Sequence, residues 1–420
     1  MNSSPSKQGV ALITVLCLTA LAMTVGTLMA TMVGGAALRS RDSLNDEQAF
    51  FTAESAIELG VQYIADGGVV PTTNSGTLAN GTYVVRIESA PVGAETRYTL
   101  TARGTVGDRS RVIGIQGLRP MRWSRFALWY DKEAMELWIA GGEKFQGPVH
   151  ANTKMRFHSY NVATLGQTRF YDTVSSTASS YDLEKPTVSP TFDMGISLNA
   201  ATQTTTSINF GLLRTNASLV LDGTTSIKLT RTNMVISNLR AGWTNRLVNY
   251  TTDGSIYVRT VTSGDSATRP GDLRISGTNG LSGRLTLISD RDIVITNHVR
   301  YYNDPTSNTN SQDALGLVAQ RHVLIQTNAP DNLFVFAHII AATGGFGVVN
   351  YDSSALGQRG NLTVYGGIVN KIRQAVGTTS GTGYTKNYIY DPRFQTRPPP
   401  NYPILAFAYQ WSSWDDRATY

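Results

Sequence analysis

Cysteine is almost absent from this sequence, because the 420 residues include a single one, Cys17. One cysteine cannot form a disulfide within the chain, and it excludes a metal site built from clustered cysteines. Cys17 also lies inside a long apolar run, where a thiol is no plausible nucleophile. The folded body must therefore be stabilised by a large core or by a repetitive hydrogen-bonded architecture.

Runs of basic charge are missing too. The net charge is +6, but Lys and Arg are scattered, with no four in succession. A stripe able to neutralise many phosphates is not indicated, so the sequence does not favour nucleic acid as a partner.

Histidines spaced for metal binding are also missing. None of the five forms a His-x-x-x-His pair, so we expect neither a metal nor another cofactor. Imidazoles are moderately common in protein interiors, so we expect His150 and His338 to be hydrogen-bonded within strands or turns.

The sequence does contain a long apolar N-terminal segment. No charged side chain occurs from Gln8 to Leu38, whereas about 20 apolar residues suffice to cross a bilayer. The run exceeds the roughly 7–15 residues of a secretory signal core. It predicts a transmembrane helix over residues 10–38, although hydropathy alone would also fit a plain membrane anchor.

Beyond the apolar run the helical pattern continues and becomes amphipathic. Small and apolar residues recur at steps of three and four as far as Ile64, with charged residues on the other face. We expect one long helix, with Gly26 and the Gly34-Gly35 pair as its weak points and a stop at residues 66–68.

Three segments with strand periodicity follow the helix. They are separated by glycine-containing turns, which indicates an antiparallel meander with one buried face. The segments are Gly81–Glu88, Arg97–Arg103 and Arg111–Ile115. For residues 39–120 we expect the helix continuation to cover this sheet, with residues 71–80 as a loop.

Residues 121–405 predict a β-rich domain. Short β-branched runs recur there between stretches of Gly, Asn, Asp, Ser and Thr, and no helix-length apolar pattern intervenes. Such closely spaced short strands favour a parallel β-solenoid, with an antiparallel β-sandwich as the alternative. The fold class is thus mainly β with one long helix. Residues 406–420 form an aromatic tail, which we expect either to cap the last coil, the preferred interpretation, or to present an adhesive patch.

Two short motifs give the N-terminus a specific resemblance. Lys7-Gln8-Gly9 precedes the apolar helix, and Gln48-Ala49-Phe50-Phe51-Thr52-Ala53-Glu54-Ser55-Ala56 lies in its amphipathic part. This region resembles type IV pilin-like proteins, and most closely the PilX-type minor pilins. The resemblance implies that residues 1–9 are a leader and that a prepilin peptidase cleaves between Gly9 and Val10.

The same resemblance implies how the helix is used. It assigns helix packing, and association with other pilin-like subunits, to Gln48, Ala49, Phe50, Ala53, Glu54 and Ala56. Major pilins carry a glutamate at the fifth mature position, where this chain has Thr14. That departure favours a minor, tip or initiating subunit.

The β-rich part carries a second resemblance. Gly147-Pro148-Val149-His150-Ala151-Asn152, Gly360–Gly367 and Asn387–Arg393 resemble motifs of an uncharacterised domain family found behind PilX-type N-termini. Because that family has no established activity, this resemblance implies architecture and no particular chemistry.

Candidate catalytic groups are sparse. Glycoside-cleaving enzymes use paired acids about 5–9 Å apart, and the candidate pairs are Asp290 with Asp292 and Asp304 with Asp313. Asp290-Arg291-Asp292 reads better as a turn with Arg291 as counter-ion. Gly344–Gly347 has no following helix, so it predicts a tight bend and no phosphate cradle.

These expectations combine into one functional hypothesis and two alternatives. We expect a non-enzymatic minor pilin or pseudopilin-like subunit of a type IV pilus or related secretion assembly. It would be a single-pass protein of the bacterial inner membrane, with its N-terminus cytoplasmic and its bulk exported. The alternatives are a membrane-anchored binding or adhesion protein for a surface glycan or protein, and a β-solenoid polysaccharide hydrolase or lyase.

Overall fold

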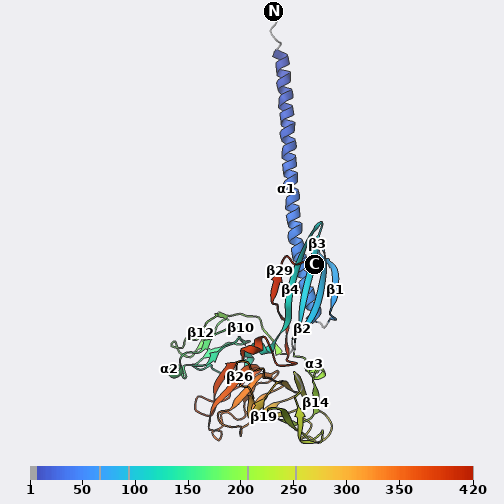
Figure 1. Cartoon of the computed structure of the whole chain (residues 1–420). Helices are drawn as coiled ribbons and strands as arrows, with labels where there is room; N and C mark the ends of the chain where they lie inside the picture. The colour runs from blue at the N-terminus through green and yellow to red at the C-terminus, as the bar shows by residue number, and fades with distance from the viewer. Residues whose placement is uncertain (1–6, 66–67, 93–94, 206–207, 251–252, 420) are drawn as a thin grey trace, which may run out of the picture. The chain divides into compact units, whose positions relative to one another are not determined.

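The computed structural model describes residues 7–65, 68–92, 95–205, 208–250 and 253–419. The protein is mainly β, with one long N-terminal apolar helix (Figure 1). It divides into two compact units. The first comprises Met1–Arg119 with Tyr409–Tyr420, and the second comprises Pro120–Ala408.

The long helix α1 runs without interruption from Lys7 to Ala65. Gly26 and the Gly34-Gly35 pair do not break it, since hydrogen bonding along a helix tolerates single glycines at a modest cost. The last described helical residue is Ala65, and residues 66 and 67 of the predicted stop lie outside the described residues.

The sheet of the first unit is an antiparallel meander. Its strand order is β1-β2-β3-β4-β28, and β29 also pairs with β4. The strands are β1 (Thr72–Leu78), β2 (Gly81–Val92), β3 (Glu95–Val106), β4 (Arg109–Arg122), β28 (Ile404–Gln410) and β29 (Ser413–Asp415). The three predicted strands are confirmed as parts of β2, β3 and β4.

The prediction of a loop over residues 71–80 is wrong. Thr72–Leu78 forms the edge strand β1, which pairs with β2 from Thr72 opposite Ile87 to Leu78 opposite Gly81. The segment is rich in Thr, Ser, Asn and Gly, so its own preference for strand is low. The free edge of β2 supplies the pairing, and tertiary context overrides the local preference.

Helix α1 packs on this sheet through small side chains. Ala53, Ala56 and Ile57 are buried in one cluster with residues of β2, β3 and β4. At Gly104 of β3 a Cβ atom would lie 2.2 Å from the carbonyl oxygen of Ala49. Small residues on both surfaces therefore allow the helix backbone to approach the strand closely.

The second unit is built from two parallel ladders. Between Gly254 and Arg373 successive strands alternate between the ladders, so neighbours within a ladder are next but one to each other along the chain. The first ladder contains β14 (Leu219–Asp222), β18 (Gly254–Arg259), β20 (Arg284–Ser289), β22 (Ala314–Ala319), β24 (Phe334–Ala341) and β26 (Gln358–Arg373). The second contains β15 (Thr225–Leu229), β19 (Leu273–Leu281), β21 (Ile293–Tyr301), β23 (Val323–Ile325) and β25 (Phe346–Val348).

Parallel pairing predominates in this unit, but antiparallel pairing is also present. Antiparallel pairing joins β15 to β16 (Asn233–Asn238) and β16 to β17 (Trp243–Asn249). An antiparallel sandwich would require such pairing throughout the unit. The strands of the two ladders range from three residues in β23 and β25 to 16 residues in β26.

The first ladder does not end at β26. That strand pairs in parallel with β5 (Leu128–Glu133), which pairs in turn with β7 (Val149–Ala151). The ladder then continues through β10 (Val174–Ser176) and β13 (Ile196–Ser197). A late strand thus stacks on an early one, and we call the β26–β5 junction the seam.

One row of aliphatic side chains runs through this ladder and across the seam. Its members lie in register on successive strands, and all are buried except the end members Leu219 and Ile196, which are half-buried. They are Leu219, Ile256, Leu287, Leu317, Ile339, Ile368, Leu128, Val149, Val174 and Ile196. Burial of each large aliphatic side chain is worth about 1.5–3 kcal/mol, so the row stabilises the stack without disulfides.

The remaining elements of the second unit are short, apart from one strand. β27 (Gly383–Tyr390) pairs in parallel with β26. The short strands are β6 (Lys144–Phe145), β8 (Arg156–Phe157), β9 (Arg169–Phe170), β11 (Asp182–Leu183) and β12 (Thr191–Phe192). The short helices are α2 (Val162–Leu165), α3 (Phe210–Thr215), η1 (Trp123–Arg125) and η3 (Pro392–Gln395).

The preferred sequence interpretation, in which the C-terminal tail caps the last coil, is wrong. Residues 409–420 belong to the first unit, where β29 places Trp414 opposite Ile115 of β4. An edge strand exposes unpaired backbone groups, and β29 satisfies some of those on β4.

The close approach of α1 to the sheet can be tested with Gly104→Ala. The added methyl group would meet backbone atoms of Ala49 and Ala53, which cannot move independently of the helix. Overpacking of this kind costs about 1–3 kcal/mol. We expect faster hydrogen exchange of the amides in β3 and in residues 49–60, measured by mass spectrometry.

The matched control for this test is Thr96→Ala, an exposed position on the same strand. We expect it to leave exchange in residues 49–60 unchanged. Equal protection of the helix in wild type and Gly104→Ala would show that the contact is looser than described.

Candidate functional site: the exposed half of the long helix

In the part of the chain that the structure describes, the side chains of residues 11–34 of α1 are exposed. This segment belongs to the one helix, among the described residues, that is long and apolar enough to cross a membrane, with a mean hydropathy of 2.1 over an 18-residue stretch. Its large side chains are exposed, including Leu12 at 66%, Met23 at 73% and Val33 at 69%. Residues 11–44 extend for about 50 Å at 1.5 Å per residue, which exceeds the roughly 30 Å of a hydrocarbon core.

The threonines in this segment do not make it polar. The hydroxyls of Thr19, Thr24, Thr27 and Thr31 donate to carbonyl oxygens three or four residues earlier, at 2.8–3.0 Å. Because the hydroxyls are satisfied within the helix, the segment can enter lipid or an apolar interface without leaving polar groups unpaired.

The predicted helix-packing residues divide between two environments. Ala49, Ala53 and Ala56 are fully buried on the chain's own sheet, and Phe50 packs at the edge of the same cluster. Gln48 is exposed and Glu54 is half-buried. Within this chain the alanines hold the helix to its own domain, so any intermolecular packing role would fall to the outer face.

The outer face carries apolar residues to which the sequence analysis assigned no packing role. Leu44, Phe51 and Leu59 are 54%, 53% and 43% exposed. They interrupt the charged face of the predicted amphipathic pattern, and that irregularity is the signal by which they could have been found. They extend the exposed apolar surface past the membrane-spanning run.

The predicted processing positions lie at the start of the helix. Gly9 and Val10 fall within α1, which begins at Lys7. Residues 1–6 of the expected leader lie outside the described residues.

Two ion pairs attach the middle of α1 to the sheet. Arg109 donates to Asp42 at 2.7 Å, and Arg111 binds Asp46 with both arms of its guanidinium, the first at 2.8 Å. The hydrogen bond from Arg111 lowers the pKa of Asp46. Because solvent screens these exposed pairs, they add little to the stability of the fold and serve mainly to orient α1 on the sheet.

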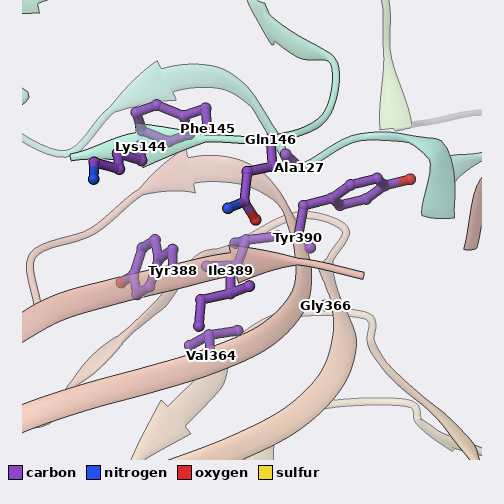
Figure 2. Close-up of a pocket in the computed structure, with 11 residues that line it drawn as sticks. Ala127, Lys144, Phe145, Gln146, Val364, Gly366, Tyr388, Ile389 and Tyr390 are labelled. Atoms are coloured by element: carbon purple, nitrogen blue, oxygen red, sulfur yellow. The ribbon is translucent and has the colours of Figure 1, made fainter. Parts of the chain in front are cut away.

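The motifs that resemble the uncharacterised domain family meet at and beside the seam. Figure 2 shows Phe145 and Gln146 on one segment facing Tyr388, Ile389 and Tyr390 on β27. The hollow between the segments measures about 10 Å³, which is space for a water molecule at most. The motifs therefore pack closely against one another at this place.

Glycines are required at this place because other atoms occupy the space of a side chain. A Cβ on Gly147 would lie 2.4 Å from the ring of Tyr390, and one on Gly367 would lie 2.2 Å from the carbonyl oxygen of Phe126. The spacing of glycines in the motifs thus reflects close approach between strands.

The two predicted structural histidines are confirmed as hydrogen-bonded and buried. His338 Nε2 lies 3.0 Å from the Phe126 carbonyl oxygen, and its Nδ1 lies 2.6 Å from the Tyr402 hydroxyl. His150 contacts Ser175 and Asn152, each at 2.8 Å. Since a carbonyl only accepts, Nε2 of His338 carries the proton and the Tyr402 hydroxyl donates to Nδ1.

The candidate acid pairs are engaged in structural bonds. Asp292 accepts from Arg321 and from the His322 amide at 3.1 Å. Asp290 accepts from the Thr260 amide at 2.9 Å and from the Tyr257 hydroxyl. The expected counter-ion role of Arg291 is wrong, because Arg291 pairs with Asp272 at 3.4 Å, a residue brought alongside by the stacking of strands.

The other candidate pair also supports loops. Asp304 accepts from the Thr306 amide at 2.8 Å, and Asp313 accepts from the amides of Gly283 and Asn303 at 2.7 and 2.8 Å. Within the described residues, no group of three or more His, Cys, Asp or Glu side chains could hold a metal ion.

The glycine-rich segment at 344–347 forms a bend, as predicted. It leads into the short strand β25, and Gly345 lies so close to the neighbouring coil that a Cβ would be 2.0 Å from the Ile372 carbonyl oxygen.

Comparison with known proteins adds little to these observations. No protein-family model and no curated protein matches the sequence. Among solved structures, the chain is similar to the crystal structure of the competence-associated pilin ComZ from Thermus thermophilus. The identity is 13%, the TM-score is 0.34, and the match covers 89% of this chain and 98% of that one. A TM-score this low does not establish a common fold, so function has to be inferred from the chain's own residues.

The buried histidine at the seam predicts a pH dependence of stability. Burial lowers the pKa of His338 to about 3 from 6.5. Between these values the unfolded chain binds a proton that the folded chain does not, so stability falls as the pH falls. From pH 6 to pH 4.5 this histidine alone should remove about 2 kcal/mol of unfolding free energy, at about 1.4 kcal/mol per unit.

The measurement is urea unfolding of the detergent-solubilised protein at several pH values, followed by tryptophan fluorescence. Trp123 and Trp129 lie 5.0 Å apart beside the seam and report on it. In His338→Gln we expect a shallower fall with decreasing pH, whatever the stability at neutral pH. Parallel pH profiles for the two proteins would contradict the assignment.

Proposed function

We propose that this protein is a non-enzymatic, minor pilin-like subunit whose N-terminal helix anchors it in a membrane and then packs among the helices of other pilin-like subunits. One observation carries this proposal: a single unbroken helix has an exposed apolar half and a half buried on its own sheet. The motifs around Gly9 and Gln48 support the same assignment.

The exposed half needs a partner for a physical reason. Covering one large apolar side chain is worth about 1.5–3 kcal/mol, and such side chains recur along residues 11–44. Lipid covers a span of about 20 residues, whereas Leu44, Phe51 and Leu59 lie beyond it. Helices of like subunits could cover both the membrane-spanning run and the apolar residues beyond it. The same surface could then contact lipid in a membrane and other helices in a filament.

The proposal also predicts how the protein is oriented in the membrane and how many copies an assembly contains. The N-terminus would be cytoplasmic before cleavage by a prepilin peptidase, and the two folded units would be exported. Thr14 in place of the usual glutamate, together with the large unit at Pro120–Ala408, favours a low-copy or tip position in a type IV pilus or a related secretion assembly.

The enzymatic alternative has less support. In the acid pairs considered for polysaccharide cleavage, each carboxylate accepts backbone or side-chain hydrogen bonds that hold turns. These carboxylates therefore have structural roles. The binding-protein alternative is favoured by one specific feature, an aromatic groove in the second unit, which is described below.

Processing can be tested directly by determining the mature N-terminus. Mass spectrometry of the protein from its native membrane should show a chain that begins at Val10, because the leader motif ends at Gly9. Gly9→Leu should leave the leader attached. A wild-type chain that starts at Met1 would contradict the pilin assignment.

A further inference from the structure

A groove in the second unit lies between the loops that follow β5 and the strands β26 and β27. Its volume is about 410 Å³, within the roughly 300–1,000 Å³ of small-molecule sites. A second hollow of about 440 Å³ adjoins it, and both are lined by Met135, Tyr351, Gln374 and Ala375. The two hollows share one wall, an arrangement that suits a chain-like ligand better than a compact one.

Aromatic rings form the walls of this groove. Tyr160 is 43% exposed, Trp138 and Tyr351 are half-buried, and Tyr384 is buried behind them. Trp138 is held edge-on to His158, with ring centroids 5.8 Å apart and planes at 85°. Trp138 is thus fixed by a neighbour while part of its ring stays accessible.

The charged groups of the groove are paired within the protein. Lys386 lies 3.4 Å from Glu143, and both side chains are largely buried. Glu136 lies 3.6 Å from Arg156, which also binds Glu133 at 2.7 Å, and the amide of Tyr160 donates to His158 Nδ1 at 2.8 Å. The lining therefore carries Glu136 and Glu143 against one lysine, Lys386, so it offers no unpaired cation to a phosphate or a uronate.

Backbone groups around the groove are paired as well. The amide of Gly141 donates to the Tyr160 carbonyl at 2.8 Å, and that of Ala140 donates to Glu143 at 2.9 Å. The amide of Thr378 donates to the Thr382 carbonyl at 2.9 Å. Extended peptides usually bind by adding to a strand edge, and these paired amides offer none.

The polar groups that line the remainder are amides and hydroxyls, on Asn161, Gln374, Thr379 and Thr385. We propose that this groove binds a neutral oligosaccharide, with sugar rings against Trp138 and Tyr160 and hydroxyls at the amide and hydroxyl groups. Aromatic faces match the apolar faces of pyranose rings, and uncharged donors and acceptors match their hydroxyls. This goes beyond the proposed assembly role, because α1 has no part in the groove.

The test is binding of the fluorescently labelled full-length protein to an array of immobilised probes. The array carries neutral oligosaccharides, uronate-containing oligosaccharides and uncharged extended peptides. The protein is kept in a detergent without a sugar headgroup, since a glycosidic detergent would compete. We expect at least one neutral oligosaccharide to bind, and the dissociation constant for it to rise at least tenfold in Trp138→Ala and in Tyr160→Ala.

Two further variants separate binding from folding. Tyr302→Ala removes an equally exposed tyrosine, at 44%, that does not line the groove, and it should leave the dissociation constant unchanged. Trp138→Phe keeps a flat ring and should recover part of the affinity lost in Trp138→Ala.

Several results would overturn the proposal. They are binding to no neutral oligosaccharide, binding only to uronates or only to peptides, and an unchanged dissociation constant in Trp138→Ala. None of these bears on the mature N-terminus or on helix packing, so failure of the groove and failure of the pilin-like assignment are distinguishable.

Discussion

The structure depends on one constraint: the exposed apolar half of α1 has to be covered by something outside the chain. The C-terminal half of α1 is already fixed to the first unit's sheet through Ala49, Ala53 and Ala56, with Gly104 opposite them. The helix therefore cannot fold back to bury its own surface. Lipid or neighbouring helices are the environments that satisfy it, and this requirement directs every functional inference about the N-terminus.

The second unit depends on a different contact, the seam between β26 and β5. The aliphatic row crosses it without a break, from Ile368 to Leu128. Beside that pair, Arg373 and Glu133 form an ion pair at 2.9 Å with side chains only 7% and 6% exposed. Such a pair strongly penalises the loss of either partner. The seam joins two runs of parallel strands into one core and explains how a chain without disulfides holds so large a β-rich unit.

The sequence predicted the features that depend on local pattern. The long helix, strands β2 to β4, the bend at Gly344–Gly347 and the buried histidines all carry a local signal of periodicity or composition. The rest depends on long-range pairing: β1 becomes a strand through β2, β29 pairs with β4 some 300 residues earlier, and β26 stacks on β5. The groove was missed for the same reason, since Trp138 and Tyr384 come together only across the fold.

The most direct test of the central claim is photo-crosslinking from the exposed helix in the native cell. A benzoylphenylalanine replaces Leu28, which is 58% exposed, and a second protein carries it at Tyr302 as the control. We predict that Leu28 yields adducts with the N-terminal helices of other pilin-like proteins and that Tyr302 does not. Adducts with lipid alone, under conditions in which filaments assemble, would contradict the account and leave the helix as a simple anchor.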